Sequence, residues 1–274
     1  MKRNVLWIAC GALLLAACAS KPPKTPYPAF LVVDEIEDVF LASLPGVRAK
    51  PLAGDLQTRR ASNRIDLPAA WRGTSGGEPG RSMEIFVLAG DLSLADIELG
   101  PGGYAFLPAG SLGFNLRSDT GARIPYFVND VDPESIIRSP ILIDANLLEW
   151  EATETPGITI KELRKDPGNG ARTWLLRIAP DATQGWQSSS VVREGYLVEG
   201  DYWHSECVAG EVATGQYLAG GYFYRAGDAV NGGPDARATI ESTWLLREAT
   251  GGEVSDHDGC PEPVSYTHLR AHET

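Results

Sequence analysis

The chain has 274 residues, of which 43% are hydrophobic and 22% charged, as in a globular protein with a buried core. Thirty glycines and nineteen prolines are scattered between apolar runs, which favours a turn-rich β architecture over a helical bundle. The formal net charge of −12 argues against nucleic acid as a partner, because a phosphate-binding surface needs an excess of basic residues.

The N-terminus has the pattern of a secretory signal. A basic Met-Lys-Arg start precedes an apolar run over residues 5–17, which is too short to span a membrane. The run ends on Leu15-Ala16-Ala17-Cys18, which resembles a bacterial lipobox. The resemblance implies removal of a signal peptide over residues 1–17 and attachment of lipid at Cys18. An ordinary signal peptide with a chance cysteine is the alternative.

The residues after Cys18 predict where the lipid anchor places the protein. An aspartate directly after the lipidated cysteine would resemble an inner-membrane retention signal. This chain has Ala19 and Ser20 there instead. We therefore expect an outer-membrane lipoprotein that faces the periplasm, with the membrane as a partner through its lipid. Residues 18–35 are rich in proline and predict an extended tether.

The C-terminal segment, residues 264–274, resembles a translated sequencing-library transposase adapter, residue for residue. We expect it to be an artefact and exclude it from the prediction of the fold. His204 and His257 are then the remaining histidines, and Cys207 and Cys260 are the thiols left after processing. An exported chain meets oxidising machinery, so Cys207 and Cys260 are predicted to form a disulfide. Two free thiols, or partners lost with the true C-terminus, are the alternatives.

An internal repeat is the strongest signal in the sequence. Residues 45–55 and 156–166 share the frame P-G-[VI]-x-x-K-x-L-x-x-D at an offset of 111 residues. Further matched segments follow in constant order, among them residues 84–91 with 194–201. Repeats of this length are domains rather than solenoid units. The sequence predicts one copy over residues 36–150, a second over 151–250 and an acidic tail over 251–263.

Each copy has the pattern of an antiparallel β structure. Its segments are short, β-branched or aromatic, and bounded by Gly, Pro or Asp. Residues 237–246 alternate between the two faces of a predicted strand. We expect each copy to be a β-sandwich or a small barrel, in which closure of the sheet leaves no unpaired edge strands.

Two motifs resemble the cupin superfamily. The spacing Gly102-x5-Pro108-x-Gly110 is that of the second cupin motif, and the strands that end at Gly90 and Gly200 resemble the end of the first. The P-G-x3-K-x-L-x2-D segment resembles the ChrR-like cupins, whose relatives often carry two copies. The resemblance implies an all-β bicupin, with two tandem cupin-type jelly-roll or β-sandwich barrels.

The resemblance also implies where a metal would be bound, because cupin enzymes usually hold it with three His and one Glu. In the second copy these positions fall on Gln187, Ser189, Arg193 and Asn231, and in the first on Gly77, Pro79, Met83 and Gly113. None is a histidine, and Glu84 and Glu194 lie one residue from the strict spacing. We therefore expect no cofactor and no catalysis in either copy. A metal bound by other ligands is the alternative.

A polar set in the second copy remains as a candidate binding site for a small polar or sugar-like ligand. Its members are Gln187, Ser189, Arg193, Glu194 and Asn231, with aromatic residues nearby. The alternative is that these residues satisfy one another in a closed pocket. His204 is expected to be an ordinary strand residue, and the Asp-His-Asp sequence around His257 a solvated loop.

Three classes of function follow from these observations. The first is a non-catalytic, metal-free binding module of the cell envelope. The second is a structural or interaction protein of the envelope that uses two fused barrels as a rigid body. The third is a cupin enzyme with relocated metal ligands. The sequence favours the first class.

Overall fold

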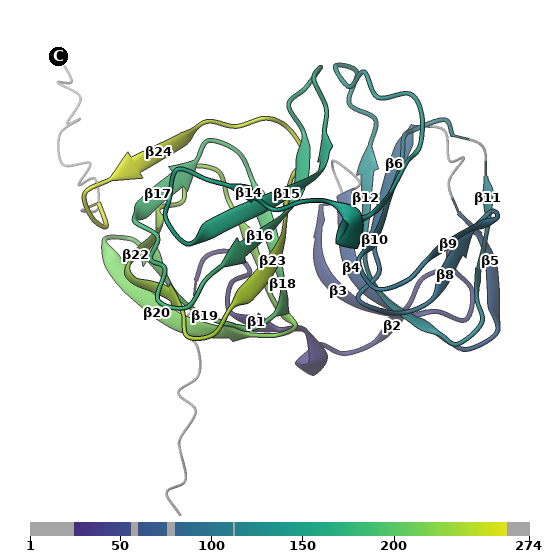
Figure 1. The fold of residues 1–274 in the computed structure, drawn as a ribbon, viewed down its shortest axis with the longest axis horizontal. Coiled ribbons are helices and arrows are strands. Elements are labelled where there is room, and N and C mark those ends of the chain that lie inside the picture. The colour runs from purple at the N-terminus through teal and green to yellow at the C-terminus, as the bar shows by residue number, and fades with distance from the viewer. Residues whose placement is uncertain (1–24, 56–59, 76–79, 112, 262–274) are drawn as a thin grey trace, which may run out of the picture.

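The computed structural model of the protein describes residues 25–55, 60–75, 80–111 and 113–261, and their regular structure is almost entirely β-strand. Within these ranges the helical elements are two 3-10 turns, η1 (Val33–Glu35) and η2 (Ala145–Leu147). The all-β prediction is confirmed, and the strands form two lobes that lie side by side (Figure 1). In the described part of the chain we find no helix with the length and hydropathy needed to cross a membrane.

The first lobe, here named the first barrel, is built from two sheets. Its strands are β2 (Val39–Phe40), β3 (Arg48–Asp55), β4 (Arg60–Leu67), β5 (Trp71–Ser75), β6 (Arg81–Phe86), β7 (Ala89–Gly90), β8 (Leu92–Leu94), β9 (Ile97–Leu99), β10 (Gly103–Leu107), β11 (Phe114–Ser118), β12 (Ala122–Asp130) and β13 (Ile141–Asp144). The large sheet has the order β13–β10–β6–β12–β4–β3–β2, with β7 paired to β12, and the small sheet has the order β5–β11–β8–β9.

The second lobe, the second barrel, repeats this plan. Its strands are β1 (Leu31–Val32), β14 (Glu151–Ala152), β15 (Ile158–Lys165), β16 (Arg172–Ile178), β17 (Trp186–Ser189), β18 (Arg193–Glu199), β19 (Asp201–Val208), β20 (Glu211–Leu218), β21 (Gly221–Arg225), β22 (Asn231–Ala238), β23 (Ser242–Glu248) and β24 (Val254–His257). The large sheet has the order β1–β21–β18–β23–β16–β15–β14, and the small sheet has the order β20–β19–β22–β17–β24.

The two large sheets have the same strand order, and each borrows its outer strand from the other half of the sequence. β1 precedes the first barrel in the chain but pairs with β21 of the second, with Leu31 opposite Tyr222. β13 follows the first barrel and pairs with β10, with Ile143 opposite Tyr104. β1 then runs through η1 into β2 of the first barrel, and β13 runs through η2 into β14 of the second barrel. This reciprocal exchange ties the two barrels together.

Two glycines mark the same turn in both barrels. Gly90 and Gly200 have φ values of +81° and +95°, in the left-handed region that favours glycine. A Cβ at Gly90 would lie 1.9 Å from the carbonyl oxygen of Gly121, and one at Gly200 would lie 2.3 Å from Oγ of Ser242. The backbone therefore requires glycine at the point where the first motif ends.

The segment before β1 packs on the second barrel, in contrast to the extended tether expected over residues 18–35. The ring of Phe30 stacks on that of Tyr217 with centroids 5.0 Å apart. The Phe30 N–H donates to the Tyr217 hydroxyl oxygen at 3.0 Å, and the Tyr224 N–H donates to the Pro28 carbonyl oxygen at 2.7 Å. Burial of the apolar residues in this segment explains why it is ordered.

The two large sheets face each other across a shared apolar core. This core draws on both barrels and includes Phe86, Phe106, Phe127, Leu175, Tyr196 and Leu245. Such a large apolar interface makes the two barrels one body rather than two independently moving units.

Two buried glutamates, Glu84 of β6 and Glu194 of β18, lie inside this interface. The Thr173 hydroxyl donates to Glu84 at 2.8 Å, and the Ser62 hydroxyl donates to Glu194, so each glutamate receives a hydroxyl from the other barrel. Arg247 contacts both glutamates, with N–O distances of 3.2 and 2.7 Å. Burial alone would raise the pKa of Glu84, but Arg164 and Arg247 hold it below its ordinary value. Glu84 therefore stays ionised, and the hydrogen bonds and ion pairs of both glutamates join the barrels.

The acidic tail expected over residues 251–263 is in part a strand. β24 pairs with β17, with His257 opposite Trp186 and Val254 opposite Ser189. The Ser188 hydroxyl lies 2.9 Å from His257 Nε2. The segment around His257 is thus an edge strand of the second barrel instead of a solvated loop.

Candidate functional site

The second barrel encloses a cavity of about 260 Å³ between its two sheets. The polar part of its wall includes Arg172, Gln187, Arg193, His204, Arg225 and Asn231. The aromatic part consists of Trp174, Tyr202, Tyr217, Phe223 and Trp244. A volume just below the usual range for ligand pockets suits a small ligand.

The structure brings three of the five predicted binding residues to the cavity. Gln187 of β17 and Asn231 of β22 lie opposite each other in the small sheet, and Arg193 lies on the facing large sheet. Ser189 and Glu194 do not line it. Ser189 donates from its hydroxyl to Glu248, which does not line the cavity either. Glu194 follows Arg193 in the strand, so it faces the interface between the barrels.

Arg193 is held in place by Glu248 of β23. Its Nε and Nη2 lie 2.8 and 2.7 Å from the same oxygen, Oε1 of Glu248. Burial lowers the pKa of Arg193 below its ordinary value, and the charge of Glu248 opposes that shift. The ion pair with Glu248 thus fixes the position of the Arg193 guanidinium in the cavity wall.

A second buried ion pair joins Arg225 of β21 to Glu206 of β19. Nε and Nη2 of Arg225 lie 3.0 and 2.6 Å from the two carboxylate oxygens, a bidentate arrangement. The Tyr27 hydroxyl donates to Glu206 at 2.7 Å, so the N-terminal segment completes the pair. Burial would raise the pKa of Glu206, but Arg225 keeps it below its ordinary value. Glu206 therefore remains an anion next to the wall, although it does not line the cavity itself.

His204 lies between this ion pair and the amide of Asn231. Its Nε2 is 3.1 Å from Arg225 Nη2 and 3.2 Å from Asn231 Oδ1. Burial, together with the charge of Arg225, lowers the pKa of His204 to about 4. The imidazole is therefore neutral at neutral pH. The sequence interpretation of His204 as an ordinary strand residue missed its place on the cavity wall.

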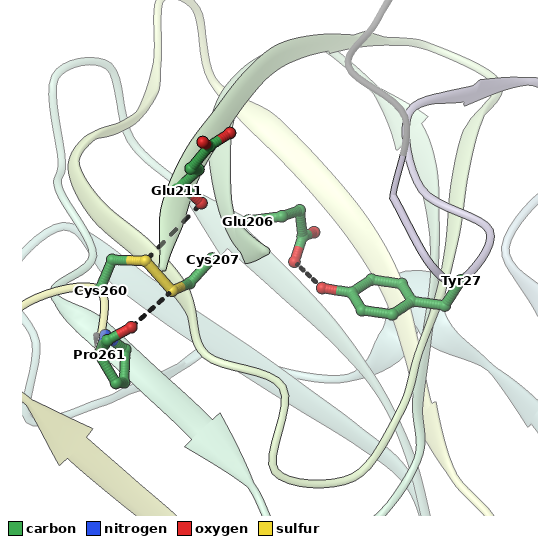
Figure 2. Close-up of a disulfide and its surroundings, with 6 residues drawn as sticks. All are labelled: Tyr27, Glu206, Cys207, Glu211, Cys260 and Pro261. Carbon is green, nitrogen blue, oxygen red and sulfur yellow. Dashed lines mark hydrogen bonds between the residues drawn. A yellow bond between two sulfur atoms is a disulfide. The ribbon is translucent and has the colours of Figure 1, made fainter. Parts of the chain in front are cut away.

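Cys207 and Cys260 are joined in a disulfide at the far end of β19 (Figure 2). Their Cα atoms are 5.3 Å apart, within the range that a disulfide spans. Figure 2 also shows Glu206, the neighbour of Cys207, directed toward Tyr27. The bridge thus fixes the C-terminal segment to the strand that carries Tyr202, His204 and Glu206.

Between the sheets of the first barrel, the described residues leave no comparable cavity, and a hollow of about 320 Å³ lies instead on the small sheet, around Arg72, Ala95 and Arg117. The space between its sheets measures about 10 Å³ and is lined by apolar side chains such as Leu92 and Ile124. Two of the sequence positions assigned to a first-copy ligand set, Gly77 and Pro79, lie outside the described residues. Met83 is buried in the apolar core. The first barrel is therefore filled by its own side chains.

A family model named "Domain of unknown function (DUF4437)" matches residues 33–252, which cover both barrels. The chain belongs to the DUF4437 family. None of the curated proteins matches it.

Solved structures similar to this DUF4437 protein share its fold. A proposed dioxygenase from Nostoc punctiforme is 19% identical with a TM-score of 0.67, over 84% of this chain and 86% of that chain. The YlbA protein from E. coli is 18% identical with a TM-score of 0.64, over 80% and 89%. Oxalate decarboxylase from Bacillus subtilis is 11% identical with a TM-score of 0.61, over 86% and 81%. These likenesses show the cupin fold.

The cupin fold implies a metal, and the residues at its ligand positions do not fit one. Gln187 and Asn231 offer amides, and the Asn231 Nδ2 is already bonded to the Gln187 and Ala229 carbonyl oxygens. Arg193 places a permanent cation where a carboxylate ligand would stand. Among the described residues, no group of three or more His, Cys, Asp or Glu could hold a metal ion.

Arg172, His204 and Arg225 are among the wall residues that the sequence analysis missed, as are all five aromatic residues of the wall. A cue for His204 was present: Tyr202, His204 and Glu206 alternate along a strand and therefore share one face. Arg225 follows the aromatic run of β21 and carries no motif of its own. Its place is fixed by pairing with Arg193 across β18 and β21.

Proposed function

We propose that this protein is a non-catalytic binding module whose second barrel takes a small polar or sugar-like ligand. The observation that carries the proposal is the cavity of about 260 Å³ with a mixed polar and aromatic wall. Amides and guanidinium groups can hydrogen-bond a polar ligand, and aromatic faces can stack against it. The wall offers both kinds of contact.

We further propose that the two barrels are two copies of a ChrR-like cupin domain. The matched sequence segments and the identical order of the large sheets support this. In this proposal the first copy has a structural role and only the second binds a ligand. Neither copy uses a metal in this proposal, because neither has an imidazole or a carboxylate at the positions of the usual ligands.

The third part of the proposal is that the protein is an envelope lipoprotein, anchored at Cys18 to the outer membrane on its periplasmic side. Cys18 lies outside the described residues. The lipobox spacing and the Cys207–Cys260 bridge support an oxidising, exported location. Replacement of Cys18 by Ser should abolish lipidation and release the protein from membranes, as seen by fractionation. Unchanged processing and membrane association would contradict lipid anchoring.

A thermal-shift screen of small polar metabolites and sugars tests the binding proposal. A ligand should raise the unfolding temperature of the wild type but not that of Ile160→Trp, in which the larger ring occupies the cavity. Ile240→Trp is the matched control, because Ile240 is exposed on the same barrel. Equal shifts in the wild type and Ile160→Trp would place binding elsewhere.

A structural or interaction protein of the envelope is the second candidate. The buried network of Glu84, Glu194 and Arg247 favours it, because it makes the two barrels a rigid body. The same screen separates the two candidates, since a purely structural protein would give no cavity-dependent shift with any compound.

A further inference from the structure

We infer that the ligand of this cavity carries a carboxylate, so that the module recognises small organic acids. This inference rests on the proposed function and narrows it to one chemical class. The observation behind the inference is the positive charge of the residues that line the cavity. Three guanidinium groups, those of Arg172, Arg193 and Arg225, line the cavity, and no Asp or Glu is among the lining residues.

Each guanidinium has a carboxylate partner that does not line the cavity. The pairs are Arg172 with Glu162, Arg193 with Glu248 and Arg225 with Glu206, at shortest N–O distances of 2.9, 2.7 and 2.6 Å. Pairing cancels the net charge but leaves the positive end of each pair toward the cavity. The Arg193 and Arg225 pairs are buried and poorly screened, whereas the Arg172 pair is partly exposed, so the first two contribute most to attracting an anionic group and repelling a cationic one.

Arg193 keeps a donor for a ligand. Its contacts with Glu248 use Nε and Nη2, and its other terminal nitrogen makes no hydrogen bond to the described residues. A guanidinium is planar and suits carboxylate oxygens in geometry as well as in charge. Arg172 resembles Arg193 in this respect, because its hydrogen bonds to Glu162 use only Nε. Two guanidinium groups can therefore donate to an incoming carboxylate.

His204 adds a neutral imidazole to the same wall. Its Nε2 lies 3.1 Å from the Arg225 Nη2 donor and 3.2 Å from the Asn231 Oδ1 acceptor, so this nitrogen can satisfy one of the two and not both. Nδ1 is buried and has no hydrogen-bond partner among the described residues. A buried ring nitrogen without a partner is costly in either tautomer unless a ligand or a water satisfies it.

The charge of the whole chain sharpens this inference. With a formal net charge of −12, the protein repels anions at long range. Binding of an acid therefore has to come from a local arrangement such as the three guanidinium groups. Weak adsorption of acids over the surface is disfavoured by the same charge.

Calorimetric titration with matched acids and neutral compounds tests the inference. The probes are D-glucuronate with D-glucose, and phenylacetate with phenylacetamide, titrated at pH 7 into the wild type. We expect at least one acid to bind at least tenfold more tightly than its neutral partner. The double variant Arg193→Gln with Glu248→Gln should lose at least tenfold of that affinity, because it removes the guanidinium without leaving a buried unpaired carboxylate. Arg177→Gln with Glu241→Gln is the matched control, since this surface pair of the same barrel does not line the cavity.

The outcomes separate the inference from the proposed function. If a neutral compound binds as tightly as its acid, and Ile160→Trp abolishes both, the carboxylate inference is overturned and the binding site stands. If acid binding is equal in the Arg193 and Arg177 double variants, the inference is also overturned. If no probe binds at 10 mM, or if Ile160→Trp leaves all binding unchanged, the proposed function fails with it. Circular dichroism and the unfolding temperature of each variant verify that it is folded.

Discussion

The two barrels share a strand order but differ in what fills them. The strand register identifies three pairs of equivalent positions at which the side chains differ. Where the first barrel has Met83, Leu107 and Val128, the second has Arg193, Arg225 and Glu248. In the first barrel these side chains belong to or pack against the apolar core, whereas in the second they form ion pairs around a cavity. The same strand order can therefore enclose either a filled apolar core or a cavity lined by charged side chains. The strand order alone does not show which of the two is present.

Buried ion pairs are weak evidence for stability, since apolar side chains of similar volume often serve as well. The second barrel could have been filled as the first one is. That it retains paired charges around an open space fits a role in binding. The predictions below test this contrast, from the largest expected effect to the smallest.

Transfer of one charge into the first barrel should be strongly destabilising. Met83→Arg places a guanidinium in the apolar core without a carboxylate, and should lower the free energy of unfolding by about 3 to 5 kcal/mol. Addition of Val128→Glu supplies the partner found in the second barrel and should restore part of the loss. Urea denaturation measures both. A loss below about 1 kcal/mol in the single variant would show that this core is less closely packed than we describe.

The disulfide is a second feature found only on the second barrel among the described residues. It closes a sequence separation of 53 residues, and the chain-entropy model gives about 4 kcal/mol of stabilisation, with many real bridges giving less. Cys207→Ala with Cys260→Ala should lower the unfolding temperature accordingly. Thiol titration of the unfolded, unreduced wild type should find neither of these two sulfurs reactive. Two reactive thiols from this pair would contradict the bridge.

His204 should give the second barrel a pH dependence that the first lacks. Its folded pKa of about 4 is below the ordinary 6.5, so between these values the unfolded chain binds a proton that the folded chain does not. Stability should therefore fall as the pH is lowered through this window. Between pH 6.5 and 5 the wild type should lose about 1.6 kcal/mol more than His204→Leu, which carries the residue found at the same place in the first barrel. Parallel curves for the two proteins would refute this role of His204.

The sequence predicted much of the fold because its signals are local. Glycines that end strands, alternation and the repeated P-G frame do not depend on distant contacts. It did not predict the exchange of β1 and β13, because a strand borrowed from the other half leaves no trace in its own segment. It also missed the turn that divides residues 237–246 between β22 and β23, since alternation continues through both.

The candidate site was predicted in part, for the same physical reason. Spacing from Gly200 placed Gln187 and Arg193 on the correct face, because strands keep a period of two. It could not place Arg172 or Arg225, whose positions depend on pairing between strands far apart in sequence. Ser189 shares the face of Gln187, but its hydroxyl is hydrogen-bonded to Glu248 and it does not line the cavity.

The most direct test of the contrast converts the second barrel toward the first. Arg193→Met with Glu248→Val gives it the side chains found at these places in the first barrel, and calorimetric titration with the strongest compound from the thermal-shift screen compares it with the wild type. We predict one molecule bound per wild-type chain, and a loss of binding in the variant at an unchanged or higher unfolding temperature. Retained binding in the variant, or two molecules bound per wild-type chain, would contradict a single ligand site in the second barrel.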